Sequence, residues 1–220
     1  MEKVKFEKTK AHQSYKLASG EGVPGVTTVL NLLAKPALLK WAWEQGRAGL
    51  DFRKTSSAAA DVGTIAHWLI ECHLKGLDPD TSEFSPVDLA AAENAEIKFL
   101  SWWDGQGMTV VGCELQLVST VYGYGGTLDI LTRTREGGAC LVDLKTSKGI
   151  YDEYWHQVAA YGQIWNELNP RDPITKYVIC RIGKQESEAD FEVQERPNVA
   201  KNLRVFLATL EAFKAIKALK

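Results

Sequence analysis

The chain has 220 residues, of which 45% are hydrophobic and 25% charged, and this composition excludes an intrinsically disordered protein. Its 26 Lys and Arg residues are balanced by 28 Asp and Glu residues, so a basic surface over the whole protein is excluded and any nucleic-acid contact must come from local patches. No stretch approaches the roughly 18 consecutive apolar residues of a membrane span, and four widely separated cysteines favour a reducing, cytoplasmic environment over disulfides.

The first half of the chain is predicted to be mainly helical. Short extended pieces around Gly and Pro turns are expected before residue 26. Capping residues and apolar residues at helical spacing then predict helices over 27–34, 36–50, 63–75 and 86–103. The third of these helices should end at Gly76. The small and polar residues 54–60 are predicted to form a connector or mobile loop.

Beyond residue 109 the pattern changes from helical spacing to the alternation that is typical of strands. Strands are predicted over 110–118, 127–133, 139–145, 175–182 and 190–194, with helices over 154–168 and 199–219. This order predicts an α/β or α+β fold in which a sheet is flanked by helices. One domain is expected over 1–220, with an accessory part over 1–62 and a core over 63–220.

The tripeptide Asp143-Leu144-Lys145 carries the most information about chemistry. Residues two apart on a strand share a face, so Asp143 and Lys145 should point together while Leu144 points to the core. A carboxylate beside an ammonium suits metal-assisted hydrolysis, because the carboxylate can hold a hard cation while the lysine orients water or stabilises phosphate charge. For so short a motif, a solvated ion pair at a strand end is the alternative.

Two more residues would complete a metal site. Asp129 lies inside an apolar strand, where an antiparallel neighbour would bring it beside Asp143, and two such carboxylates repel unless a cation lies between them. His67 lies on an otherwise apolar helix, where a single histidine is either structural or a ligand. Together with the two acids it would leave open positions on Mn²⁺ or Mg²⁺.

Four other polar residues are candidates for the same site. Glu114 should point away from its strand neighbours, either onto the acidic face or into solvent. Glu71, four residues after His67, is either the partner of that histidine or a surface acid. Gln157 and Tyr161 lie four residues apart on a predicted helix, where they either donate to phosphate oxygens or pack against the core.

Local positive charge and aromatic rings could add nucleic-acid contacts. Near the sheet edge the positive charge would come from Lys145, Lys148, Arg133 and Arg135. Most tryptophans are expected in the core rather than on bases. The tryptophans considered for base stacking are Trp41, Trp43, Trp102, Trp103, Trp155 and Trp165.

Five of these motifs resemble, in their order, the PD-(D/E)XK nuclease superfamily in its RecB-like and Cas4-like branch, over roughly residues 63–182. They are Gly63-Thr-Ile-Ala-His67, Glu114, Gly126-Thr-Leu-Asp129, Asp143-Leu-Lys-Thr146 and Gln157-x-x-x-Tyr161. The segment His12…Tyr15…Val23-Pro-Gly-Val-Thr-Thr looks like the opening of phage and prophage members. The resemblance implies a restriction-endonuclease-like core, with a central mixed sheet flanked by helices and an N-terminal helical addition.

The resemblance also implies roles for individual residues. One or two Mg²⁺ or Mn²⁺ ions would be held by His67, Asp129, Asp143 and the backbone carbonyl of Leu144. Lys145 would be the catalytic lysine and Glu114 a further acidic residue of the site. Substrate contacts are expected from Gln157, Tyr161, Thr146 and Lys148. No iron–sulfur cluster is expected, because the cysteines are not clustered near the C-terminus as in many Cas4-like members.

The expected function is a metal-dependent deoxyribonuclease, most simply an exonuclease in phage-type DNA recombination, repair or end processing. The alternatives are a structure-specific flap endonuclease and a DNA-binding module without turnover. DNA, as single strands or duplex ends, is the expected partner, and a recombination or annealing protein is a further candidate. The helices over 27–50 and the connector over 54–60 would form a cap or arch under which a free DNA end threads.

Overall fold

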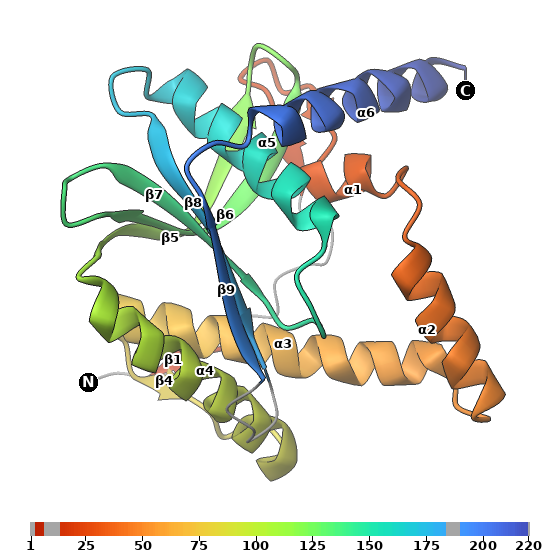
Figure 1. The fold of residues 1–220 in the computed structure, drawn as a ribbon, viewed down its shortest axis with the longest axis vertical. Coiled ribbons are helices and arrows are strands. Elements are labelled where there is room, and N and C mark those ends of the chain that lie inside the picture. The colour runs from red at the N-terminus through yellow and green to blue at the C-terminus, as the bar shows by residue number, and fades with distance from the viewer. Residues whose placement is uncertain (1–2, 7–13, 184–189, 220) are drawn as a thin grey trace.

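The computed structural model describes residues 3–6, 14–183 and 190–219 (Figure 1). At its centre is one five-stranded mixed sheet in which the strands follow one another in chain order. The strands are β5 (Thr109–Ser119), β6 (Tyr124–Arg133), β7 (Ala139–Lys145), β8 (Ile174–Ile182) and β9 (Phe191–Arg196). The predicted architecture, a central mixed sheet flanked by helices, is confirmed.

The sheet changes direction once. Strands β5, β6 and β7 are joined by short turns and pair antiparallel, whereas β7 and β8 are parallel. Parallel neighbours need a crossover connection, and helix α5 (Asp152–Leu168) supplies it. Strand β9 returns antiparallel to β8. Helix α5 is the next element after β7, and Lys145 at the end of that strand lies beside Tyr154 in the first turn of α5.

Helices cover both faces of the sheet (Figure 1). Helices α3 (Phe52–Lys75) and α4 (Pro86–Gln106) pack on one face, where Ile70 and Phe99 are fully buried. Helices α1 (Val26–Leu30), α5 and α6 (Ala200–Ala218) pack on the other face, around Trp155 and Phe206. Each large side chain buried in these two cores contributes about 1.5–3 kcal/mol of hydrophobic free energy. The two cores therefore hold the sheet in place from both faces. Side chains that project from its central strands are held in place with it.

Helix α3 corrects one prediction. Residues 54–60 continue this helix instead of forming a connector. The helix begins after Asp51, whose carboxylate accepts a hydrogen bond from the Arg53 N–H at 2.9 Å, and it ends at Gly76, whose φ of 66° makes it a left-handed cap. The connector prediction was wrong because small, polar residues indicate exposure, while the alanines among them still favour a helix. The predicted stop at Gly76 is confirmed.

The N-terminal residues depart from the predicted bounds in smaller ways. Helix α1 is shorter than the predicted 27–34, and α2 (Pro36–Arg47) ends before residue 50. The expected extended pieces include the antiparallel strands β2 (Tyr15–Lys16) and β3 (Gly22–Val23). Strand β1 (Val4–Lys5), which pairs in parallel with β4 (Pro79–Asp80), was not predicted, because two-residue strands carry no periodic signal. His12 lies outside the described residues.

The N-terminal hairpin is tied to strand β6. The Gly125 N–H donates to the Pro24 carbonyl at 2.9 Å, and the Tyr15 hydroxyl lies 2.9 Å from Thr127 Oγ1. A side chain at Gly125 would collide with the Tyr15 ring, so glycine is needed for this close approach. The hairpin therefore packs against the strand that carries Asp129, two residues beyond Thr127.

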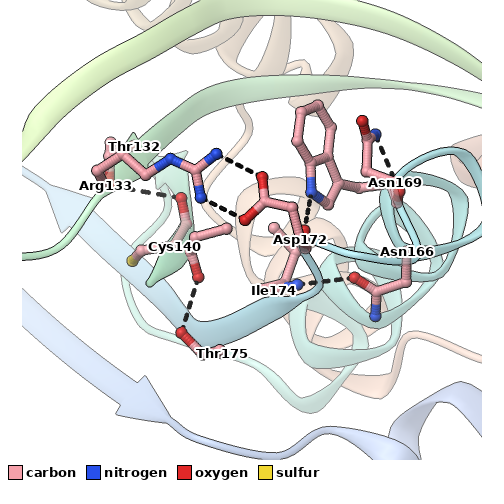
Figure 2. A network of polar contacts seen from close by, with 10 residues as sticks. Thr132, Arg133, Cys140, Asn166, Asn169, Asp172, Ile174 and Thr175 are labelled. Atoms are coloured by element: carbon pink, nitrogen blue, oxygen red, sulfur yellow. Dashed lines mark hydrogen bonds and ion pairs between the residues drawn. The ribbon is translucent and has the colours of Figure 1, made fainter. Parts of the chain in front are cut away.

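A polar network secures the turn between α5 and β8 (Figure 2). Arg133 at the end of β6 forms a two-pronged ion pair with Asp172, whose backbone carbonyl accepts from Trp165 Nε1 at 2.8 Å. Arg135 donates instead to the Gly105 carbonyl, at 3.2 Å. The positive charge that these two arginines are expected to supply near the sheet edge stays a prediction. Among the described residues, no helix has the length and apolarity that crossing a bilayer requires.

Candidate active site

A cleft of about 410 Å³ lies between α3 and the central strands. Residues of one face of α3 form one wall, and residues of β5, β6 and the end of β7 form the other. The lining residues are Phe6, Ala60, Gly63, Thr64, His67, Trp68, Glu71, Glu114, Asp129 and Thr146. Four of the five sequence motifs thus contribute side chains to one cleft.

Three ligand-type residues converge in this cleft. His67, Glu114 and Asp129 each offer one ligand atom, and these atoms lie within 4.8 Å of one another. The distance between His67 Nδ1 and Asp129 Oδ2 is 3.9 Å. Metal–ligand bonds are about 2.0–2.6 Å long, so one cation between these atoms could reach all of them. One imidazole and two carboxylates are a donor set that fits a divalent cation.

Asp129 is positioned by the point at which two strands separate. The antiparallel ladder of β6 and β7 ends at the pair Ile130 and Val142, so Asp129 and Asp143 lie beyond it. Instead, Asp129 Oδ2 accepts a hydrogen bond from the Leu144 N–H at 2.8 Å. The Asp129 carboxylate thus accepts the hydrogen bond that a ladder partner of Leu144 on β6 would otherwise accept, and this hydrogen bond fixes the position of the carboxylate. The metal-ligand role expected for the Leu144 carbonyl stays a prediction.

The backbone of Glu114 departs from a regular strand. Its φ of 54° is the only left-handed value among the non-glycine residues that the structure describes, and such a value costs about 1 kcal/mol or more. As a result Cys113 and Leu115 pack into the cores on opposite faces of the sheet, so the simple alternation predicted around Glu114 is wrong. Its two neighbours pair with the residues that flank Asp129, which sets Glu114 beside Asp129.

Two acids of the cleft, Glu114 and Asp129, resist ionisation in the absence of a cation. Burial, followed by the nearby Asp129 and Glu71 carboxylates, raises the pKa of Glu114 to about 8. Burial also raises the pKa of Asp129, although Lys145 and the Leu144 N–H act in the opposite direction. A divalent cation would favour the charged carboxylates, so its binding should release protons.

Asp143 and Lys145 form a buried ion pair on β7. The Lys145 ammonium contacts the Asp143 carboxylate, whose side chain is completely buried. The two residues therefore do share a face, as predicted, but the alternative of a solvated pair is wrong. Burial and Asp129 raise the pKa of Asp143 to about 6 against the effect of Lys145. Burial lowers the pKa of Lys145, but the two aspartates outweigh it and the net pKa is raised, so this lysine stays charged.

Asp143 is not one of the three converging residues. It does not line the cleft, and the structure directs its carboxylate to Lys145. Lys145 Nζ also lies 5.1 Å from the centre of the Tyr154 ring, at the start of α5. The ligand role expected for Asp143 and the catalytic role expected for Lys145 stay predictions.

Gln157 and Tyr161 meet on α5, as their spacing predicts. Gln157 Nε2 donates to the Tyr161 hydroxyl at 2.8 Å. Tyr161 is buried, and burial together with the nearby Asp143 holds the pKa of its hydroxyl well above the usual value. The hydroxyl therefore remains protonated beside the ion pair of β7. A DNA contact by either residue stays a prediction.

The remaining predicted residues have different surroundings. Thr146 lies on the cleft wall against Gly63, where an added side chain would lie 2.5 Å from Thr146 Oγ1. This contact explains why the helix motif needs glycine at 63. Lys148 is exposed in the bend after β7. Glu71 lines the cleft, and its hydrogen-bonded partner is Lys75, whereas a partnership with His67 was one of the two alternatives.

Two aromatic residues of the cleft were missed by the sequence analysis. Phe6 and Trp68 line it and form an edge-to-face cluster with Phe84, with ring centroids 5.2–5.7 Å apart. Trp68 could have been found, because it follows His67 on the same helix. Phe6 had no local signal, since the pairing of β1 with β4 brings it there.

Comparison with known proteins gives only distant likenesses. No protein-family model matches the chain, and no curated protein matches its sequence. Among solved structures, SSO0001 is 14% identical, with a TM-score of 0.35 over 56% of this chain and 61% of that one. A protein of Eubacterium rectale named "Putative exonuclease" is 14% identical, with a TM-score of 0.46 over 70% and 64%. LHK-Exo, solved in complex with dAMP, is 17% identical, with a TM-score of 0.40 over 74% and 89%.

The chain thus spans less than two thirds of the length of the first two of these proteins. None of the three TM-scores reaches 0.5. The roles of the residues in this chain are therefore inferred from its own site and not from these structures.

The close contact of Gly126 with Tyr161 leads to a stability prediction. A methyl group at Gly126 would collide with the Tyr161 ring, which is buried and cannot move aside freely. We expect Gly126→Ala to lower the free energy of unfolding by about 1–3 kcal/mol. Gly46→Ala is the matched control, because a methyl group there meets no atom within 4 Å. Thermal melts in which the two variants were equally stable would contradict this account.

The raised pKa of Glu114 leads to a prediction about pH. The pKa of this carboxyl is about 8 in the folded state and 4.5 in the unfolded state, so between these pH values the folded protein binds more protons than the unfolded chain. The free energy of unfolding therefore falls as the pH rises from about 4.5 to about 8. Without metal, Glu114→Gln should therefore melt roughly 2–6 °C above the wild type at pH 9, and close to it at pH 5. Adding Mn²⁺ at pH 9 should stabilise the wild type more than the variant. Melting curves that shift equally at both pH values would rule this out.

Proposed function

We propose that the chain is a metal-dependent DNA nuclease of the PD-(D/E)XK type. The observation that carries the proposal is the convergence of His67, Glu114 and Asp129 in one cleft, directly beside the buried pair of Asp143 and Lys145. These residues come from α3, β5, β6 and β7, so their meeting is not a local effect of the sequence. Their order along the chain is that of the family motifs.

The proposed chemistry follows from the charges at the site. When bound, Mg²⁺ or Mn²⁺ held by His67, Glu114 and Asp129 would supply positive charge opposite a scissile phosphate and favour deprotonation of water. The Leu144 N–H keeps Asp129 in position. Lys145, charged and held by Asp143, contributes a fixed positive potential next to Asp129, which suits the negative charge that builds up on a phosphate during hydrolysis.

The finer proposal is an exonuclease that acts in the cytoplasm in phage-type recombination, repair or end processing. It rests on the motif order and on the resemblance of the N-terminal segment, and it treats residues 1–62 as an accessory part of a single nuclease domain. Gln157, Tyr161, Thr146 and Lys148 are proposed to contact the DNA. An arch made by a mobile connector is not part of the proposal, because residues 54–60 are helical.

The test uses DNA labelled at one end, as single strands and as duplex, together with a covalently closed circle. We expect nucleotides to be released from an end with Mg²⁺ or Mn²⁺, no products with EDTA, and an intact circle. Cleavage of the circle would replace the exonuclease by an endonuclease. Retained DNA binding without any cleavage would refute the nuclease proposal and favour the non-catalytic module.

A further inference from the structure

Helix α2 lacks the buried face that holds the other long helices. It connects α1, on one side of the sheet, with the start of α3, on the other, and its main contact is with α3 (Figure 1). None of its described side chains is buried, and Leu39 and Trp43 are 70% and 59% exposed. A helix of 12 residues is marginal in water without such packing. Large exposed apolar side chains on such a helix indicate a binding surface.

The exposed residues form pairs of aromatic rings and cations. Leu39, Trp43 and Arg47 lie four residues apart and so share one face of α2. The Arg47 guanidinium lies 4.8 Å from the centre of the Trp43 ring. At the start of α3, the Arg53 guanidinium lies 5.9 Å from the centre of the half-exposed Phe52 ring. Rings and cations in this combination stack bases and neutralise phosphates.

The local charge favours a polyanion over a second copy of this chain. The whole chain has a net charge of −2. Residues 31–54 are basic by contrast, with two acids, Glu44 and Asp51, against five cations. These cations are Lys35, Lys40, Arg47, Arg53 and Lys54. The positive charge is thus concentrated on the segment that exposes the aromatic rings, which suits the phosphates of a nucleic acid.

One face of α3 connects this segment to the cleft. Arg53, Ser56, Ala60, Thr64 and His67 follow one another at about one helical turn each, and so lie on the same face. The first three are exposed, and the last three line the cleft. Arg53 and His67 are 14 residues apart, which is about 21 Å along the helix at 1.5 Å per residue. About six nucleotides of a stacked single strand would cover this distance.

We propose that α2 and the first turn of α3 form a stacking platform for single-stranded DNA and guide the strand along α3 into the cleft. Single strands are specified because Trp43 and Phe52 can stack only on bases that are free of a duplex. The inference rests on the proposed nuclease function for what happens in the cleft, whereas binding to the platform requires no metal.

Binding is tested by the fluorescence anisotropy of labelled dT12 in EDTA, over a series of salt concentrations. Trp43→Ala should weaken binding about tenfold without changing the slope of log K against log salt, while Trp43→Phe should bind like the wild type. Arg47→Gln should reduce the slope by about 0.7, the value for one lost cation on a single strand. Val87→Ala and Lys201→Gln, two exposed positions on α4 and α6, are the matched controls and should change nothing.

Two outcomes of this experiment overturn the platform. One is that Trp43→Ala and Arg47→Gln bind dT12 with the same affinity as the wild type. The other is self-association of the wild type, seen by sedimentation velocity and abolished by Trp43→Ala, which would make a second copy the occupant of α2. Circular dichroism melts check that each variant is folded, as expected for exposed positions.

A minimal substrate separates this inference from the proposed function. Thymidine 5′-(p-nitrophenyl phosphate) has one phosphodiester and is too short to reach α2. With Mn²⁺, Trp43→Ala should hydrolyse it like the wild type while its KM for dT12 rises about tenfold. If the wild type binds dT12 as expected but hydrolyses neither substrate, the platform stands and the nuclease proposal fails. If both are hydrolysed and Trp43→Ala leaves the KM for dT12 unchanged, the platform fails and the nuclease proposal stands.

Discussion

DNA cleavage should fall by about a thousandfold when Asp129 is replaced by Asn. The substitution keeps an oxygen that can accept the Leu144 N–H, but it removes the charge that Asp129 contributes to the group with His67 and Glu114. Only Glu114 of the three ligands then carries a charge, because the His67 imidazole binds metal in its neutral form, and the cation would bind more weakly and be less well placed. Because a buried charge is removed, the variant should melt at or above the wild-type temperature without metal.

The measurement combines cleavage of end-labelled DNA with calorimetric titration of Mn²⁺. Glu96→Gln is the matched control. Glu96 is also a partly buried acid next to a histidine, with 3.7 Å between its Oε1 and His73 Nδ1, but it does not line the cleft. It should cleave DNA normally. More than a tenth of wild-type activity in Asp129→Asn, with Mn²⁺ affinity unchanged, would exclude Asp129 as a ligand.

Replacing Lys145 by Met should cost about 3 kcal/mol of folding free energy and nearly all activity. The loss of stability arises because Asp143 remains completely buried without the ammonium that it contacts. Asp143 can respond by binding a proton, so the cost should increase as pH rises above about 6. The loss of activity arises because the fixed positive charge beside Asp129 disappears.

The double variant Lys145→Met with Asp143→Asn separates the two effects. Removing both charges should restore most of the stability, because no unpaired buried charge remains, while cleavage stays at least about a hundredfold below the wild type. Lys176→Met is the matched control: its ion pair with Glu195, at 2.8 Å, joins two neighbouring strands but is partly exposed to solvent, so the cost should be below about 1 kcal/mol. If the double variant regained activity along with stability, Lys145 would have only a structural role.

Much of the fold could be predicted because strand and helix periodicity is a local property. The bounds of β7 agree with the predicted 139–145, and the Asp143 and Lys145 side chains lie on one face as the two-residue period requires. The end of α3 at Gly76 was predictable for the same reason, since a left-handed cap is specified by one residue. The residues that converge in the cleft were likewise predictable as candidates, because each belongs to a short motif.

The sequence by itself thus determined the order of the elements, the central sheet and the acids, histidine and lysine available for chemistry. Only the tertiary structure decided which of them meet. The left-handed backbone at Glu114 and the end of the β6–β7 ladder at Ile130 set Glu114 and Asp129 beside His67, while Asp143 is directed to Lys145. The pairing of β1 with β4 added Phe6 to the same cleft. These outcomes depend on contacts between residues far apart in the chain, where the free energy of packing overrides local periodicity.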